Sequence, residues 1–363
     1  MKTRDCVLLL LSTVLLSCNK GKSDTKEKTA NNIKENNCVV EKSHGFLVVK
    51  TTESNCKKVD VITVDSLFNV KDSIASYQAK YEISGDLSKK DFFRIDTINN
   101  CCYFFESKSD EALENFIHNY LIQFNYKTGK TYKLHDFKDS NIDEWEVDPY
   151  NNYLVYRDFE LEKLFTFNLK TNEIKAIYKF NLSPWYLNVH IEKYKYVLTS
   201  KEKGNTIKRE IEKKNNKCNS VTIWTTPSPL LNAKFAAHAN KYAEIAPEKI
   251  RGNEAALYLY DKRNSLKQDL LMLYGNEEIY WIADYIVIKC NDRILVFNHK
   301  LNLIKMISVE NLRKVLSIDN ELIIFEQRKS PKKHFLLNKE LKLIELKTKL
   351  FDNIQSIEAV PNM

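Results

Sequence analysis

Apolar and aromatic residues along the chain fall into short runs, and one pattern of such runs recurs. A run ends in an aromatic residue or Leu, an Asn or Asp with a basic tight turn follows, and a second apolar run comes after it. Asn, Asp and Gly supply the positive φ angles that tight hairpins need. The turns lie 37 to about 50 residues apart; five clear copies begin at Leu121, Leu164, Leu257, Ile294 and Phe335, with a weaker copy near Ile211 to Asn216.

A second pair of short apolar runs precedes each of these hairpins. Residues 145–148 and 153–156 form one such pair, and residues 279–282 and 285–288 form another. Each repeat therefore contains four short strands in about 40 to 48 residues, which is typical of a β-propeller blade. The runs are apolar at nearly every position, as expected when neighbouring blades cover both faces of each sheet.

One repeat also resembles a known family at the level of its residues. Trp145-Glu-Val-Asp-Pro-Tyr-Asn-Asn-Tyr-Leu-Val-Tyr156 is similar to the W-x-x-D-G-x-x-I-A-F unit of TolB-like and WD40-like propellers. The resemblance implies a propeller fold and carries no activity.

The two ends of the chain predict how the ring closes. Residues 351–361 parallel residues 137–149, the first strand of a blade, but nothing downstream can pair with them. Residues 46–49, 59–64 and 67–74 can supply the other three strands, and pairing the termini removes exposed sheet edges. We therefore expect an all-β domain over residues 38–363 with seven four-stranded blades, closed by both termini; six blades plus an N-terminal hairpin is the alternative.

The N-terminus has the form of a processing segment. Residues 1–17 combine a charged start with an apolar run too short to span a membrane. Leu15-Leu16-Ser17-Cys18 resembles the bacterial lipobox, which implies cleavage after Ser17 and a lipid on Cys18; a plain secretory peptide or a buried helix is the alternative. Residues 18–37 are almost entirely polar and predict a flexible tether. No later stretch is apolar enough for a transmembrane helix.

The residues after Cys18 bear on localisation. Asn19 differs from the Asp that retains many lipoproteins at the inner membrane, so the outer membrane is favoured. The Lys- and Asn-rich composition resembles that of Bacteroidetes, whose surface lipoproteins carry an acidic cluster after the lipidated Cys. This chain has Asn-Lys-Gly-Lys-Ser there, so the periplasmic face is favoured over the cell surface.

Charge, glycine and cysteine content limit the kinds of partner and site that the sequence favours. The formal net charge of +8 is modest for 363 residues and does not favour nucleic acid as a partner. With only seven Gly there is no phosphate-binding glycine motif, and no C-x-x-C or H-E-x-x-H spacing indicates a metal site. In an oxidising compartment Cys38 and Cys56 are candidates for a disulfide that closes a short loop at the start of the fold. Cys101 and Cys102 are adjacent in a strand, so their side chains should point to opposite faces.

The loops joining the second and third strands of the blades share one face of a propeller, and they are charged. We hypothesise that this face binds a partner through an acidic side and a basic side. Its candidate residues are Asp110, Glu111, Glu114, Lys201, Lys203, Lys249, Arg251, Arg328, Lys329, Lys332 and Lys333. The opposite face carries turn residues Lys127, Lys170, Arg263 and Lys300, which could lie against anionic headgroups.

No set of residues indicates catalysis, a metal or a cofactor. The seven His are scattered, and none lies in a nucleophile elbow or a metal-binding spacing. The sequence therefore favours a non-enzymatic binding or assembly protein, an immunity-type protein included, whose partner is another envelope or secreted protein. The alternative is a propeller enzyme or carbohydrate binder acting at the mouth of the central channel.

Overall fold

A computed structural model describes residues 45–52, 57–83, 93–109, 117–138, 142–180, 186–202, 205–214, 217–225, 234–238, 241–249, 252–260, 265–273, 277–290, 292–328 and 331–362. The chain divides into two units, Met1–Lys42 and Ser43–Met363, and every described residue belongs to the second. Within these residues the secondary structure consists of strands, and no helix is long and apolar enough to cross a membrane.

The described strands pair into seven antiparallel sheets. Six sheets have four strands, and in the other one β4 and β5 pair with successive parts of β6 along the same edge, so that together they replace a first strand. In spatial order the first sheet is β29 (Ser356–Pro361), β1 (Phe46–Thr51), β2 (Lys58–Val64) and β3 (Val70–Gln78). The second is β4 (Glu82–Ile83) and β5 (Phe93–Asp96), then β6 (Cys101–Ser109), β7 (Ile117–Asn125) and β8 (Thr131–Asp136).

The remaining five sheets follow the chain order. They are β9 (Ile142–Asp148), β10 (Tyr153–Asp158), β11 (Lys163–Asn168) and β12 (Ile174–Lys179); β13 (Tyr186–Ile191), β14 (Lys195–Glu202), β15 (Asn205–Glu212) and β16 (Lys217–Thr225); β17 (Lys234–His238), β18 (Lys241–Lys249), β19 (Gly252–Tyr260) and β20 (Ser265–Leu273); β21 (Glu278–Ile282), β22 (Tyr285–Lys289), β23 (Arg293–Phe297) and β24 (Leu303–Ser308); and β25 (Leu312–Ile318), β26 (Leu322–Gln327), β27 (Lys333–Asn338) and β28 (Leu343–Leu346).

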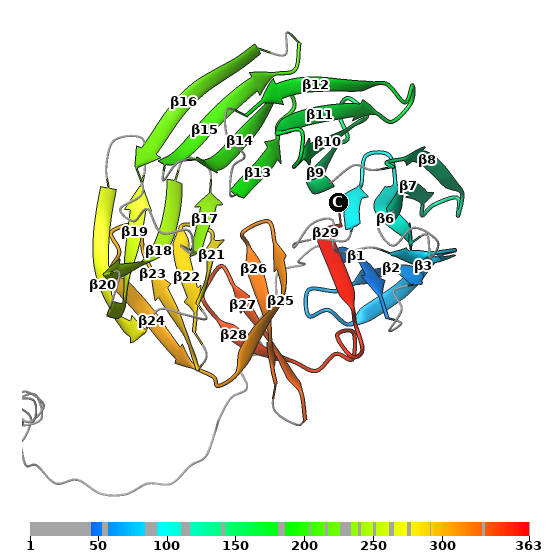
Figure 1. Ribbon diagram of the computed structural model, residues 1–363. Coiled ribbons are helices and arrows are strands. Elements are labelled where there is room, and N and C mark those ends of the chain that lie inside the picture. Colours follow the sequence, from blue (N-terminus) through cyan, green and yellow to red (C-terminus); the bar gives the residue numbers. More distant parts are fainter. Residues whose placement is uncertain are drawn as a thin grey trace, which may run out of the picture. The chain divides into compact units, whose positions relative to one another are not determined.

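The first strands of neighbouring sheets lie against one another around a common centre (Figure 1). β29 contacts both β25 and β5, β5 contacts β9, β9 contacts β13, and β17 contacts β21. The fourth strands lie at the outside of the ring. This arrangement confirms the predicted all-β propeller fold.

The first sheet joins the two ends of the unit. β1 pairs with β2 on one side and with β29 on the other, with Phe46 opposite Pro361 and Thr51 opposite Ser356. The prediction that a C-terminal strand completes a sheet with three N-terminal strands is confirmed. The third of those strands begins at Val70 instead of Leu67, because residues 65–69 form a turn.

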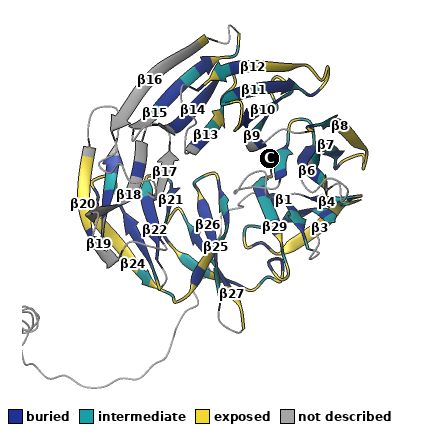
Figure 2. Cartoon of the chain, viewed as in Figure 1, coloured by how far each residue is buried: buried dark blue, intermediate teal, exposed yellow. Residues whose placement is uncertain are grey.

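Among the described residues, those of the inner strands are mostly buried and those of outer strands such as β24 are mostly exposed (Figure 2). Within the part of the chain that the structure describes, six hydrophobic clusters each join two sheets, and the cluster between the first and last sheets contains Phe46, Phe68 and Phe351. Cys101 lies in one cluster of the second sheet and Cys102 in the other, so the prediction that they point to opposite faces is confirmed. Fourth strands such as β3 and β24 are largely exposed.

The predicted positive φ is found in two of these turns, at Gly129 (φ 69°) and Asn172 (φ 60°), while the repeated Asn that opens each turn has another role. Asn125, Asn168 and Asn298 do not themselves have positive φ. Their side-chain oxygens accept hydrogen bonds from backbone N–H groups of the turn, at 2.9 to 3.1 Å. The positive φ falls later in each turn, and at Leu301 (φ 62°) it falls on a residue for which this conformation is unfavourable. The hydrogen bonds of the Asn side chain therefore stabilise the turn even where a residue such as Leu301 has an unfavourable φ.

Phe68 offers a test of ring closure. Its ring is fully buried, lies 4.9 Å from the ring of Phe46 and 5.7 Å from that of Phe351, and its carbonyl oxygen accepts a hydrogen bond from Thr348. We expect Phe68→Ala to lower the free energy of unfolding by about 3 to 5 kcal/mol, because it leaves a cavity between the first and last sheets. Urea unfolding followed by circular dichroism measures this. The control is Leu67→Ala at the neighbouring position, whose side chain is 42% exposed; equal effects of the two substitutions would contradict the prediction.

Candidate functional site

Most residues predicted to form a site lie outside the part of the chain that the structure describes. They are Cys18, Cys38, Cys56, Asp110, Glu111, Glu114, Lys203, Arg251 and Lys329. Lys201 lies in β14 and Lys249 in β18, where the backbone alone is described. As predicted, these segments join the second and third strands of their sheets. Whether their charges form one binding face stays a prediction.

Three predicted basic residues have described side chains at the connection between β26 and β27. Arg328 is exposed. Lys332 lies 3.8 Å from Glu326, and Lys333 lies 3.0 Å from Glu345. Both carboxylates belong to the same sheet as the lysines, so part of the predicted positive charge is compensated locally.

A buried histidine lies beneath this connection. His334 is 3% exposed, its ring centre lies 5.0 Å from that of Phe351, and its Nε2 lies 3.5 Å from a carboxylate oxygen of Glu326. Burial lowers the pKa of the imidazole, and the carboxylate of Glu326 offsets this only in part. His334 therefore resists protonation in the folded protein.

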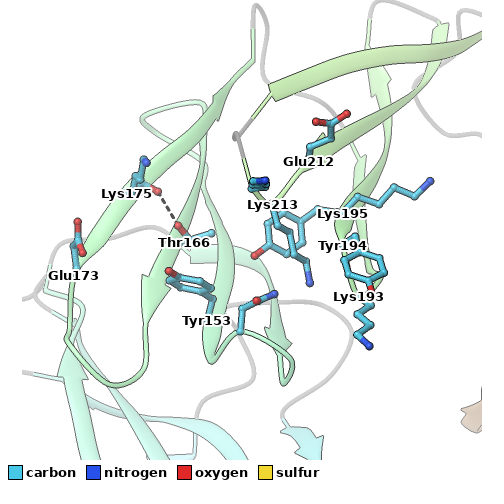
Figure 3. A pocket seen from close by; sticks show the side chains of 12 residues that line it. Tyr153, Thr166, Glu173, Lys175, Lys193, Tyr194, Lys195, Glu212 and Lys213 are labelled. Carbon is cyan, nitrogen blue, oxygen red and sulfur yellow. Dashed lines mark hydrogen bonds between the residues drawn. The ribbon is translucent and has the colours of Figure 1, made fainter.

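The described surface is hollowed on the opposite, turn-bearing face. A groove of about 800 Å³ lies between the sheet of β9 to β12 and the sheet of β13 to β16 (Figure 3). Turns of both sheets contribute to it. Its twelve lining residues are Asn151, Tyr153, Thr166, Glu173, Lys175, Lys193, Tyr194, Lys195, Tyr196, Glu212, Lys213 and Lys214.

Asp148 does not line the groove, but it holds three residues that do, Lys213, Tyr196 and Asn151. Its carboxylate is fully buried and lies 2.7 Å from Lys213 Nζ, which reaches it from the turn between β15 and β16. The hydroxyl of Tyr196 donates a hydrogen bond to the same carboxylate at 3.0 Å, and two backbone N–H groups and the Asn151 amide donate as well. Burial, followed by the charge of Asp148, raises the pKa of Tyr196, so this hydroxyl remains a donor.

The rim of the groove is exposed. Tyr194 is 75% exposed, and Lys193 Nζ lies 5.5 Å from the centre of its ring. The backbone of Tyr194 is nevertheless held, because its carbonyl oxygen accepts a hydrogen bond from the backbone N–H of Lys213 at 3.1 Å. Figure 3 shows Tyr153, Thr166 and Glu173 on one side of the groove and Lys193, Tyr194 and Glu212 on the other.

The charges of the groove are close to balance. Two of its five lysines are in ion pairs: Lys213 with Asp148, and Lys195 with Glu210 at 2.9 Å. The hydrogen bond that Lys195 donates to Glu210 raises the pKa of Lys195, with a contribution from the charge of Glu192. The other three lysines share the groove with Glu173 and Glu212, which leaves a surplus of one positive charge (3 − 2).

The described side chains offer no metal centre. Within the described residues, no group of three or more His, Cys, Asp or Glu is placed to hold a metal ion. Cys101, Cys102 and Cys290 are buried and unbridged, and burial raises the pKa of each thiol. Trp145 and Trp281 pack between sheets.

Sequence reasoning missed the groove. Asp148 was noted as part of a repeat unit, and Lys193 and Tyr194 stand in a short turn without a motif. The signal that could have found them is the exposed Tyr between two lysines at a place where equivalent turns carry Asn or Asp. A turn that departs from the repeated sequence in this way is a candidate for a binding role.

Comparisons with known proteins identify the fold and not the family. No family model matches the chain, and no curated protein matches it. Among solved structures, it is similar to a protein described as a putative 6-phosphogluconolactonase from Bacteroides uniformis, with TM-score 0.51 and 8% identity over 88% of this chain and 100% of that one. A second such protein, from Bacteroides fragilis, has TM-score 0.50 and 10% identity over 89% and 99%. TolB from Acinetobacter baumannii also matches, with TM-score 0.42 and 10% identity over 74% and 64%.

The buried ion pair predicts an asymmetric response to substitution. We expect Lys213→Met to lower the free energy of unfolding by about 3 kcal/mol, because it leaves the buried Asp148 carboxylate without its cation. Asp148→Asn combined with Lys213→Met should recover most of this loss. Urea unfolding measures both, with Lys214→Met on the exposed neighbouring residue as control. A control effect as large as that of Lys213→Met would contradict the prediction.

His334 predicts a pH dependence with a defined sign. Its pKa is lowered in the folded protein, so the unfolded chain binds the proton more readily below about pH 6.5. Stability from this residue is therefore present above about pH 6.5 and is lost as the pH falls toward the folded pKa. The difference in unfolding free energy between wild type and His334→Gln should shrink between about pH 7.5 and 5. His299→Gln, at an exposed turn position, controls for loss of one histidine; a difference that does not vary with pH would refute the prediction.

Proposed function

We propose that this protein is a non-enzymatic binding or assembly protein of the cell envelope, held at the outer membrane by a lipid on Cys18. The propeller fold provides a rigid frame for such a role. The lipobox-like sequence and the polar segment after it support the anchor, and the absence of an acidic cluster there supports the periplasmic face.

The observation that carries the binding function is the groove between β9 to β12 and β13 to β16. Its volume of about 800 Å³ falls within the range of small-molecule and cofactor sites. Lys213 in its lining is fixed by an ion pair with the buried Asp148, while Tyr194 on the rim is exposed. A fixed lining residue needs no further ordering when a partner binds, and the exposed ring of Tyr194 is accessible to that partner.

We further propose that each of the seven sheets is one blade of a single ring. The pairing of β29 with β1 supports this count over six blades with a separate N-terminal hairpin. The repeat at residues 145–156 supports the resemblance to TolB-like and WD40-like propellers.

The partner proposed is another envelope or secreted protein, which includes a toxin captured by an immunity-type protein. Arg328 and Lys332 remain exposed at the end of the ring opposite the groove and support a charged contact there. A propeller enzyme or carbohydrate binder at the channel mouth is the alternative.

The test is capture of a partner by the full-length lipidated protein, carrying an affinity tag after Met363. Cells are crosslinked and envelopes solubilised before mass spectrometry. We compare a groove variant, Tyr194→Ala with Lys214→Ala, and a connection variant, Arg328→Ala with Lys332→Ala. The matched control, Lys130→Ala with Lys347→Ala, removes two exposed lysines that belong to no proposed contact.

One stoichiometric protein should be captured by wild type and control and lost in the groove or the connection variant. No partner for wild type, or equal capture by every variant, would contradict the proposal. A bound small molecule in the absence of a partner would favour the alternative.

A further inference from the structure

We propose that the groove between β9 to β12 and β13 to β16 binds a neutral saccharide, with Tyr194 as the platform for a sugar ring. This inference rests on the proposed binding function and names the ligand of one site. The site lies on the turn-bearing face and is separate from the channel mouth.

The balance of charge argues against an anionic ligand. Lys175, Lys193 and Lys214 are exposed in the groove, but Glu173 and Glu212 lie among them. A site for phosphate or a carboxylate would gather positive charge without carboxylates beside it. Lysine side chains donate hydrogen bonds and carboxylates accept them, so a mixed set suits ligand groups that can both accept and donate. Sugar hydroxyls do both.

The lining also argues against a peptide segment. Every one of the twelve lining residues is Lys, Glu, Asn, Thr or Tyr, so none has an aliphatic side chain. Peptide-binding grooves usually offer apolar pockets for anchoring side chains. Here the apolar surface comes from the rings of Tyr153, Tyr194 and Tyr196 and the stems of the lysines.

Tyr194 is the residue placed to hold a sugar ring. Its side chain is 75% exposed, yet its backbone is tied to Lys213 by a hydrogen bond of 3.1 Å. An aromatic ring presents a flat apolar face, which packs against the C–H face of a pyranose while the hydroxyls stay free at the edge. Glu212, the last residue of β15, and Lys214, in the turn after it, also line the groove and can form hydrogen bonds with those hydroxyls.

The experiment measures binding to the purified full-length protein by isothermal titration calorimetry, in a detergent without a sugar headgroup. The neutral probes are maltotriose and tri-N-acetylchitotriose, and the anionic probes are trigalacturonate and inorganic phosphate. At least one neutral probe should bind with a millimolar or lower Kd, and Tyr194→Ala should weaken it by at least about tenfold. Tyr132→Ala, which removes another exposed tyrosine from β8, should leave binding unchanged.

Glu212→Gln separates the two ligand chemistries by the sign of its effect. It removes an acceptor and raises the positive charge of the groove, so a saccharide should bind more weakly and an anion more tightly. Three results would each overturn the inference. The first is that neither neutral probe binds, and the second is that the anionic probes bind Glu212→Gln more tightly while no neutral probe binds. The third is that Tyr132→Ala and Tyr194→Ala weaken binding equally. If partner capture persists while no saccharide binds, this inference fails alone; if saccharides bind and no partner is captured, the proposed protein partner fails.

Discussion

The antiparallel pairing of β29 with β1 is the contact on which the other sheets depend. Without it, β1 would present an unpaired edge at one end of the array, and the cluster around Phe46, Phe68 and Phe351 would lose one wall. The pairing joins residues 46–51 to residues 356–361, so nearly the whole unit lies inside one closed loop of chain. The second sheet has a packed neighbour on each side, which explains why β6 is buried on both faces.

The pairing of β29 with β1 also determines which positions can be substituted without loss of stability. A position inside the ring is packed against two sheets, whereas the turns at its ends are limited mainly by their own backbone hydrogen bonds. Asn125, Asn168 and Asn298 satisfy those bonds with a side-chain oxygen, and the residues between are then free to differ. The turn between β13 and β14 carries Lys193 and Tyr194, and it is there that the described surface is hollowed.

Much of the fold could be predicted from the sequence because each repeat carries its own local signal. The four-strand period, the closing strand at residues 356–361 and the opposed side chains of Cys101 and Cys102 all depend on pattern and strand alternation. β4 was missed because two residues carry no pattern. The groove was missed because its walls come from Tyr153 and Tyr194 in neighbouring repeats, and their separation in space depends on how two sheets pack.

The buried pair of Asp148 and Lys213 ties those two repeats together. Burying two charges costs desolvation that their attraction barely repays, so a buried ion pair is weak evidence for stability. Apolar side chains of similar volume would fill the same space at least as well. Apolar side chains would not fix the relative orientation of the two sheets. Lys213 extends from one sheet to the carboxylate of Asp148 on the neighbouring sheet, and the hydroxyl of Tyr196 donates a hydrogen bond to the same carboxylate at 3.0 Å. The pair therefore sets the relative position of the two turns that form the groove, and this accounts for a costly contact at the edge of an otherwise apolar interface.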